Sequence, residues 1–189
     1  SVRFLEDMGV ERVILPRELN FEQIEYIRQN TGIGIETFVH GALCISYSGQ
    51  CLFSSMIGGR SGNRGFCAQP CRKKYRLYKN REMIDTRGKY LLSPKDLNTA
   101  EILPELIDTG IDAFKIEGRM KRPEYVAGVV SIYRNLIDRY MKKPSDYIVY
   151  KDELKQLAQL FNRDFTTAYF LNNPKFDLIN PVRPYNRGL

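Results

Sequence analysis

Four cysteines are the residues best suited to chemistry in this 189-residue chain, and all of them lie between positions 44 and 71. Thiolates are ligands for zinc and for iron–sulfur clusters. The spacing, Cys-x6-Cys-x15-Cys-x3-Cys, lacks the paired Cys-x2-Cys of zinc ribbons, but both metals accept four thiolates. Spacing alone therefore leaves an iron–sulfur cluster, zinc, and buried or disulfide-bonded cysteines open. The candidate ligands are Cys44, Cys51, Cys67 and Cys71.

The beginning of the chain bears on the disulfide alternative. Residues 1–7 contain no apolar signal-peptide region, and 43% hydrophobic residues are enough for a real core. Disulfides are typical of small secreted domains, whereas clustered cysteines in the reducing cytoplasm are more often metal ligands. We therefore expect a cytoplasmic protein with a metal centre. No run of about 18 apolar residues is present, so we expect no membrane span.

Charged residues in two expected strands form a second set of candidates. Lys115 and Glu117 alternate near the end of the expected strand 111–116, so their side chains share one face. Charges in a strand buried on both faces are costly unless they are paired or catalytic. We therefore assign catalytic roles to Glu36, His40, Lys115 and Glu117. The alternatives are salt bridges for Lys115 and Glu117, a surface position for Glu36, and a structural hydrogen bond for His40.

A basic segment surrounds the second half of the cysteine cluster. Between Gly58 and Tyr90, ten Lys and Arg face two acidic residues, a local charge of +8. This excess suits an anionic partner such as RNA, and interleaved tyrosines such as Tyr78 can stack on bases. The alternatives are a solvated basic loop and packing of the tyrosines within a hairpin. Guanidinium groups also bind carboxylates. We assign substrate binding to Arg60, Asn63, Arg64, Arg72 and Arg119.

Strands and helices alternate along the first 142 residues. Apolar runs predict strands at 10–15, 33–39, about 89–93 and 111–116. Helical spacing predicts helices that begin near Asn20, near Asn98 and at Pro123. This alternation indicates a parallel sheet. We expect an α/β fold in which residues 1–142 form the carboxyl half of a (β/α)8 barrel, with the cysteine loops at its carboxyl-terminal face.

Two segments depart from the barrel pattern. Residues 40–92 are expected to be a cysteine-rich insertion, with a β-hairpin over 74–92 that turns near Asn80 and Arg81. Residues 143–189 are expected to be an extension, with a helix from Tyr150 to Phe161 and then loops. A complete barrel needs roughly 250 residues. We therefore expect the chain to derive from a larger protein, and its open edge to pair with a missing amino-terminal half barrel, another chain or itself.

The cysteine segment carries a resemblance to a known family. The stretch Glu36–Ser54 closely resembles the signature of the U32 peptidase family, which places Glu, Phe, Gly, Cys, Gly, Cys and Ser at these spacings. Phe53 stands where the family favours an aliphatic residue. Four later stretches are also similar to the family: Gly59–Gly65, Cys67–Arg72, Lys115–Lys121 and Phe161–Thr166.

The resemblance implies both a cofactor and a set of activities. In similar members the four cysteines bind a 4Fe-4S cluster. Several members hydroxylate tRNA, ribosomal RNA or ubiquinone precursors without molecular oxygen, and some take the oxygen from prephenate. Other members are named collagenases or proteases.

Weighed together, these features favour a cluster-dependent hydroxylase of RNA that uses a small organic acid as oxygen donor. The +8 segment favours a polyanion over a lipid quinone. Arg60, Arg64 and Arg119 are expected to hold the carboxylates of the acid. A peptidase is the first alternative, although the chain has one histidine and no His-Glu-x-x-His motif. A non-catalytic iron–sulfur module that binds RNA is the second.

Overall fold

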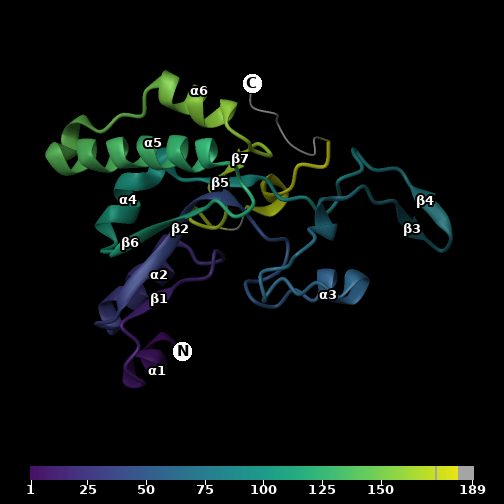
Figure 1. Ribbon diagram of the computed structural model, residues 1–189, viewed down its shortest axis with the longest axis horizontal. Coiled ribbons are helices and arrows are strands. Elements are labelled where there is room, and N and C mark those ends of the chain that lie inside the picture. The colour runs from purple at the N-terminus through teal and green to yellow at the C-terminus, as the bar shows by residue number, and fades with distance from the viewer. Residues whose placement is uncertain (173, 183–189) are drawn as a thin grey trace.

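The computed structural model describes residues 1–172 and 174–182, and a five-stranded sheet lies at its centre (Figure 1). The central strand β2 (Gly34–Ala42) pairs in parallel with β1 (Arg12–Ile14) and with β6 (Ala113–Glu117). Helix α2 (Phe21–Asn30) connects β1 to β2, α4 (Leu103–Asp108) leads into β6, and α5 (Pro123–Lys142) follows β6. The parallel strand–helix alternation expected from the sequence is confirmed.

Local sequence explains why these elements form. Helix α2 begins with a capping box, in which Asn20 and Gln23 each accept a hydrogen bond from the other's backbone N–H, at 2.9 and 3.1 Å. Pro123 occupies the first turn of α5, where its missing N–H costs nothing. Helix α5 then buries residues at helical spacing, namely Tyr125, Val129, Ile132, Tyr133 and Leu136.

The strand expected at about 89–93 is wrong. Ser93 N donates to Tyr90 O at 3.1 Å in a turn, and Pro94 follows it without an N–H to offer a sheet. The strand lies further along, at β5 (Asp96–Asn98), which pairs antiparallel with the end of β2. Strand β5 also pairs in parallel with β7 (Phe165–Thr166), so the sheet is mixed and includes residues from beyond position 142.

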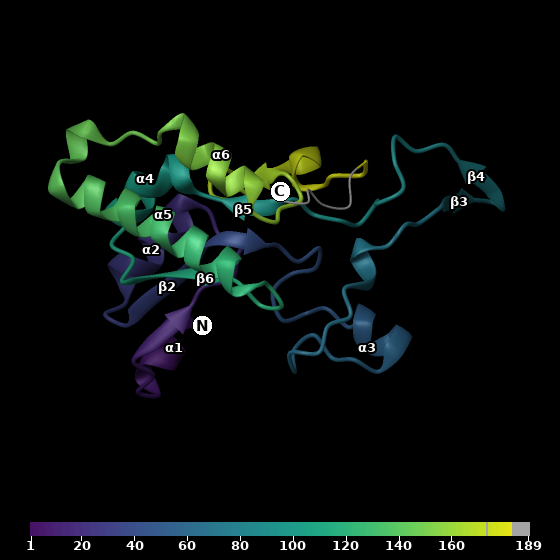
Figure 2. The ribbon, with the colours of Figure 1, turned by 45° about the horizontal axis from the view of Figure 1, so that its top comes forward.

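All labelled helices except α3 lie on one side of the molecule, and the cysteine segment (residues 43–95), which includes α3, extends to the other (Figures 1 and 2). Helix α6 (Lys151–Gln159) confirms the helix expected near 150–161, and it lies beside α5. Helix α1 (Val2–Asp7) opens the chain, and α3 (Phe53–Gly58) lies within the cysteine segment. Short 3-10 turns are η1 (Pro70–Arg72), η2 (Ala100–Ile102), η3 (Pro144–Asp146) and η4 (Lys175–Leu178). The expected loops at the carboxyl end include positions 173 and 183–189, which lie outside the described residues.

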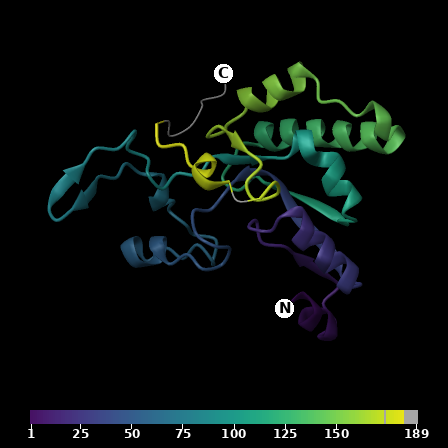
Figure 3. The same ribbon diagram turned by 180° about the vertical axis from the view of Figure 1, so that it is seen from behind.

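A β-hairpin projects from the cysteine segment, as the sequence predicts. Strand β3 (Leu77–Lys79) pairs antiparallel with β4 (Glu82–Ile84), and Asn80 and Arg81 form the turn with φ of 50° and 72°. Two consecutive residues of positive φ are typical of the two-residue turns that match strand twist. Figure 3 shows the hairpin standing apart from the sheet. Within the described residues, no helix is both long enough and apolar enough to cross a membrane.

Candidate functional site

The four thiols converge beyond the carboxyl end of β2. Cys44 follows that strand, Cys51 precedes α3, and Cys67 and Cys71 lie before and within η1. Burial raises the pKa of both Cys44 and Cys71, and the neighbouring thiols raise each value further. All three other cysteines raise the pKa of Cys71 in this way, so the four thiols lie close enough for their charges to interact.

Hydrogen-bond donors and cations surround the thiols. Gln69 N donates to Cys67 Sγ at 3.3 Å, and the backbone N–H of Ser46 donates to Cys44. The charges of Arg17 and Arg72 lower the pKa of Cys44 and of Cys71, respectively, against the larger effect of burial. These groups stabilise negative charge on sulfur, as donors around a thiolate-bound centre do.

Arg72 joins three segments of the site. Its guanidinium donates to Leu43 O at 2.7 Å, to Ser93 Oγ at 3.0 Å and to Pro94 O. Leu43 adjoins Cys44, so Arg72 connects the Cys71 turn to the Cys44 loop and to the segment that enters β5. Burial lowers the pKa of Arg72 to about 10, which still leaves it charged at neutral pH.

The glycine-rich loop, Gly59–Gly65, is held in place by hydrogen bonds from its polar side chains. Arg60 Nε donates to Phe66 O at 2.9 Å, and Asn63 Nδ2 donates to Gly49 O at 2.9 Å. Arg64 is exposed. The side chain of Arg119 approaches this loop, because a Cβ placed at Gly65 would lie 3.7 Å from Arg119 Nη1. The predicted substrate-binding residues thus occupy the cysteine region, but Arg60 and Asn63 already serve the loop.

The charged candidates on the sheet are ion-paired. Lys115 Nζ lies 3.3 Å from Glu36 Oε1, and Arg17 Nη2 lies 3.1 Å from Glu117 Oε2. The Arg17 guanidinium also stacks over the Phe38 ring at 3.6 Å. Both charges of β6 therefore pair with third residues, on a sheet face that remains partly accessible.

His40 lies inside the core rather than beside the thiols. It is 1% exposed and packs against Tyr125, Tyr133 and Phe165, with Nδ1 3.3 Å from Tyr133 Oη. Burial, helped by the charge of Lys121, lowers its pKa to about 3. The imidazole is therefore neutral at physiological pH and makes a structural contact.

A buried polar cluster adjoins the Cys67–Cys71 turn. Arg163 Nη1 lies 3.0 Å from Asp96 Oδ1, and Arg163 Nη2 donates to Gln69 Oε1 at 3.2 Å. Lys121 packs its Nζ over the Phe161 ring at 3.1 Å, and burial lowers its pKa to about 8. Asp96 Oδ2 and Tyr125 Oη are buried and have no hydrogen-bond partner within the part of the chain that the structure describes. The cluster contacts the cysteine turn through the hydrogen bond from Arg163 to Gln69.

Comparison with known proteins identifies the family. Residues 1–180 match the profile described as peptidase family U32. The chain belongs to peptidase family U32. Over 183 residues the U32 chain is 41% identical to the tRNA hydroxylation protein P1 of Bacillus subtilis, covering 94% of the chain and 43% of that protein.

Two other relatives carry different names. The U32 chain is 40% identical over 184 residues to a 23S rRNA 5-hydroxycytidine synthase of Escherichia coli, covering 94% of the chain and 28% of that protein. It is 38% identical over 173 residues to a collagenase of Porphyromonas gingivalis, covering 84% of the chain and 42% of that protein. The chain thus spans less than half the length of these curated relatives. No solved structure matches it significantly.

Sequence reasoning missed the polar cluster of this U32 chain. Asp96 stands in a three-residue strand without a periodic pattern, so its burial could not be read from the sequence. Lys121 and Arg163 lie in two of the stretches that resemble the family, and that was the one available signal. Arg163 lies two positions before β7 and 67 positions after Asp96, so their meeting depends on the long-range pairing of β5 with β7.

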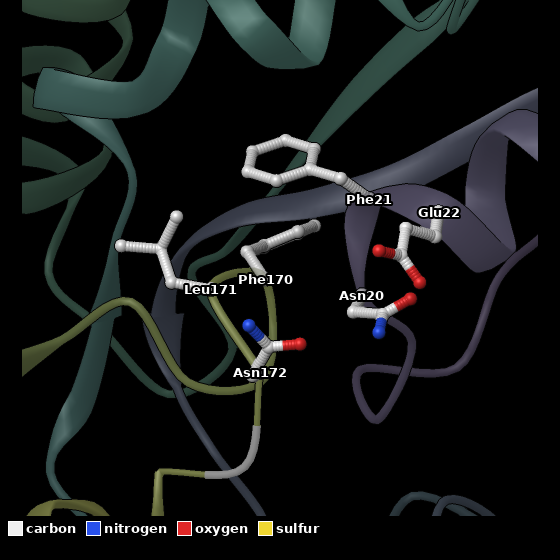
Figure 4. A pocket seen from close by; sticks show the side chains of 6 residues that line it. All are labelled: Asn20, Phe21, Glu22, Phe170, Leu171 and Asn172. Atoms are coloured by element: carbon white, nitrogen blue, oxygen red, sulfur yellow. The ribbon is translucent and has the colours of Figure 1, made fainter.

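A shallow pocket of the U32 chain lies away from the thiols. It has a volume of about 200 Å³ and lies between the start of α2 and residues 170–172 (Figure 4). Its lining consists of Asn20, Phe21, Glu22, Phe170, Leu171 and Asn172. The lining includes none of the cysteines or clustered cations, so we place the chemistry at the cysteine site instead.

Proposed function

We propose that this U32 chain is the cysteine-bearing part of an RNA hydroxylase, in which Cys44, Cys51, Cys67 and Cys71 hold a 4Fe-4S cluster. The observation that carries the proposal is the convergence of the four thiols at the end of β2, beside the strongly basic segment. Relatives named for hydroxylation of tRNA and for synthesis of 5-hydroxycytidine in 23S rRNA align with 94% of the chain and support the reaction class.

The donor set fits such a cluster in its chemistry. Four cysteines, two backbone N–H groups directed at sulfur and two nearby arginines suit an anionic thiolate-bound centre. Within the described residues no three Cys, His, Asp or Glu side chains are placed to hold a single metal ion. A 4Fe-4S cluster takes four cysteine thiolates, so its ligands need not meet at a single metal ion.

The residues of this chain supply binding and proton handling. A bound cluster would provide a redox-active or Lewis-acidic iron. Arg119 and Lys121, just beyond β6, offer cations to the carboxylates of a small organic acid such as prephenate. Lys121 has a pKa of about 8, so it can also exchange a proton near neutral pH. The Arg17 guanidinium and the Arg119 backbone N–H donate to the two oxygens of the Glu117 carboxylate, at 3.1 and 3.0 Å, and hold it in place.

The sheet supports a place for the chain within a larger barrel. Strands β1 and β6 each pair only with β2 among the described strands, so each leaves an outer edge open. We infer that β1, β2 and β6 belong to the carboxyl half of a (β/α)8 barrel, and that further strands complete it. In such a barrel the loops after β2 and β6 share the carboxyl-terminal face, where catalytic groups gather.

The direct test compares RNA nucleosides by mass spectrometry in cells with and without the full-length gene. We expect one hydroxylated nucleoside to disappear on deletion and to return with the wild-type gene but not with Cys67→Ala. A Tyr47→Phe variant, altered on an exposed ring, is the matched control and should restore it. Unchanged nucleosides, together with peptide cleavage that survives Cys67→Ala, would reject the proposal in favour of a peptidase.

A further inference from the structure

The β3–β4 hairpin is an exposed element without a packing partner in the described part of the chain. Strands β3 and β4 pair only with each other, and all six strand residues are exposed. An isolated two-stranded hairpin is marginally stable in water and normally packs against something. Figures 1 and 3 show it extended away from the sheet and helices.

Both faces of the hairpin carry apolar side chains. Leu77 and Ile84 are cross-strand neighbours on one face, and Tyr78 and Met83 are neighbours on the other. Their exposed fractions lie between 39% and 63%. No other ring or cation within the described residues packs on Tyr78, whose aromatic face is therefore free to stack.

The charge of the hairpin favours a polyanion over an apolar protein surface. Seven Lys and Arg between residues 73 and 89 outnumber Glu82 and Asp85, and all seven are exposed. None of the seven forms an ion pair with an acidic side chain in the described structure. Positive charge interleaved with free aromatic rings is the arrangement that binds single-stranded RNA.

The base of the hairpin is tied to the cysteine site. Tyr75 N donates to Lys89 O at 2.7 Å and closes the stem, while Tyr75 Oη donates to Pro70 O at 2.9 Å. Pro70 precedes Cys71, and the Tyr75 ring also packs 6.1 Å from the Phe53 ring of α3. The hairpin therefore begins beside the turn that carries Cys71.

We propose that the β3–β4 hairpin is an RNA-binding arm, on which Tyr78 stacks on an unpaired base while Lys79, Arg81 and the stem cations contact phosphates. The inference deepens the proposed function, since it names where the RNA is held. Residues that the arm uses are separate from the cysteines, so binding and hydroxylation can be measured apart.

The test uses the full-length protein and a fluorescein-labelled RNA stem–loop with an unpaired loop. Tyr78→Ala should weaken binding by about tenfold, because a base–aromatic stack contributes on the order of 1–3 kcal/mol, and Tyr78→Phe should bind like the wild type. Lys79→Gln with Arg81→Gln should reduce the slope of log K against log salt by about 1.4. Lys155→Gln is the matched control, because it removes one positive charge at an exposed position of α6, away from the hairpin. It should leave both the RNA affinity and the salt slope close to those of the wild type.

Clear outcomes separate this inference from the proposed reaction. Three results would each contradict an RNA-binding role for the hairpin. The Tyr78→Ala variant could bind RNA as tightly as the wild type, Lys155→Gln could lose as much affinity as the hairpin variants, or the wild type could bind no RNA. Intact RNA binding that depends on Tyr78, without any hydroxylated nucleoside lost on gene deletion, would keep the arm and reject hydroxylation. Loss of affinity must come with unchanged thermal unfolding, which the exposed position of Tyr78 predicts.

Discussion

Arg163 and Asp96 form an ion pair in the interior, with Nη1 3.0 Å from Oδ1 and side-chain exposures of 8% and 1%. The other arm of the same guanidinium donates to Gln69, which lies between Cys67 and Cys71 and adopts a left-handed conformation with φ of 55°. The backbone of a non-glycine residue is strained in that conformation and persists in it when neighbouring contacts hold it. The Arg163–Asp96 pair therefore helps to position the cysteine turn through its hydrogen bond to Gln69.

The first prediction concerns this ion pair. Asp96→Asn removes the charge that compensates Arg163, and breaking a buried pair from one side costs about 3 kcal/mol or more. We expect a clear fall in the urea midpoint of the full-length protein. The control is Asp138→Asn, which breaks the exposed Arg134–Asp138 pair on α5 and should cost about 0.5 kcal/mol or less. Equal shifts for the two variants would show that Asp96 lacks the proposed role.

The second prediction is a pH dependence of stability from His40. Its pKa is about 3 in the folded chain and near 6.5 when unfolded, so the unfolded chain binds the proton first. The contribution of neutral His40 to the free energy of unfolding is complete above pH 6.5. It is lost as pH falls from 6.5 toward 3, by up to about 1.4 kcal/mol per pH unit. Urea unfolding at pH 7, 6 and 5 measures it.

His40→Phe is the matched variant for that measurement. It keeps an aromatic ring among Tyr125, Tyr133 and Phe165 but cannot titrate. Its stability should fall less steeply over the same pH range, even if its value at pH 7 is lower. If the two proteins lose stability in parallel, the titrating group is not His40.

The third prediction concerns metal content. Protein purified without air should absorb broadly near 400 nm and contain about four irons per chain. Cys67→Ala should lose the absorbance and most of the iron, while Tyr47→Phe keeps both. Stoichiometric zinc without iron in the wild-type preparation would contradict the cluster.

The fourth prediction tests the junction of β2 and β6. Gly41 has φ of 106°, and a Cβ there would stand 2.4 Å from Glu117 O. Gly41→Ala should therefore destabilise the chain by more than about 2 kcal/mol, from strain and from displacement of β6. At Gly58, the last residue of α3, a Cβ meets nothing within 4 Å, so Gly58→Ala should be neutral or slightly stabilising. Similar thermal midpoints for both variants would refute the close approach.

Elements with a local signal were predictable from the sequence. The capping box at Asn20, Pro123 at the start of α5 and the Asn80–Arg81 turn each follow from the preferences of a few adjacent residues. Strand β5 and the two-residue β7 exist because distant segments pair, and no adjacent residues encode that. The apolar pair Leu91–Leu92 led to a strand prediction at about 89–93, whereas the strand lies at residues 96–98.

The location of His40 shows how strict alternation can misplace one residue within a strand that is otherwise predicted well. Strict alternation would place Glu36, Phe38 and His40 on one face. The pairing of β2 with β6 shifts register between Phe38 and His40, and this bulge turns His40 toward the core beside Val39. The four cysteines could be proposed as a group from their spacing. The contact of the Asp96–Arg163 pair with the cysteine turn could not be predicted without the tertiary structure.

The antiparallel pairing of Ala42 with Asp96 brings the two ends of the cysteine segment together at one place in the sheet. Everything from residue 43 to residue 95 thus leaves and returns through a single pair of adjacent strands. Lengthening such a loop lowers the free energy of unfolding only slightly, by roughly 0.6 kcal/mol for each doubling, because the entropy of loop closure grows with the logarithm of loop length. We therefore expect the hairpin to tolerate shortening or extension while the register of β1, β2 and β6 stays the same.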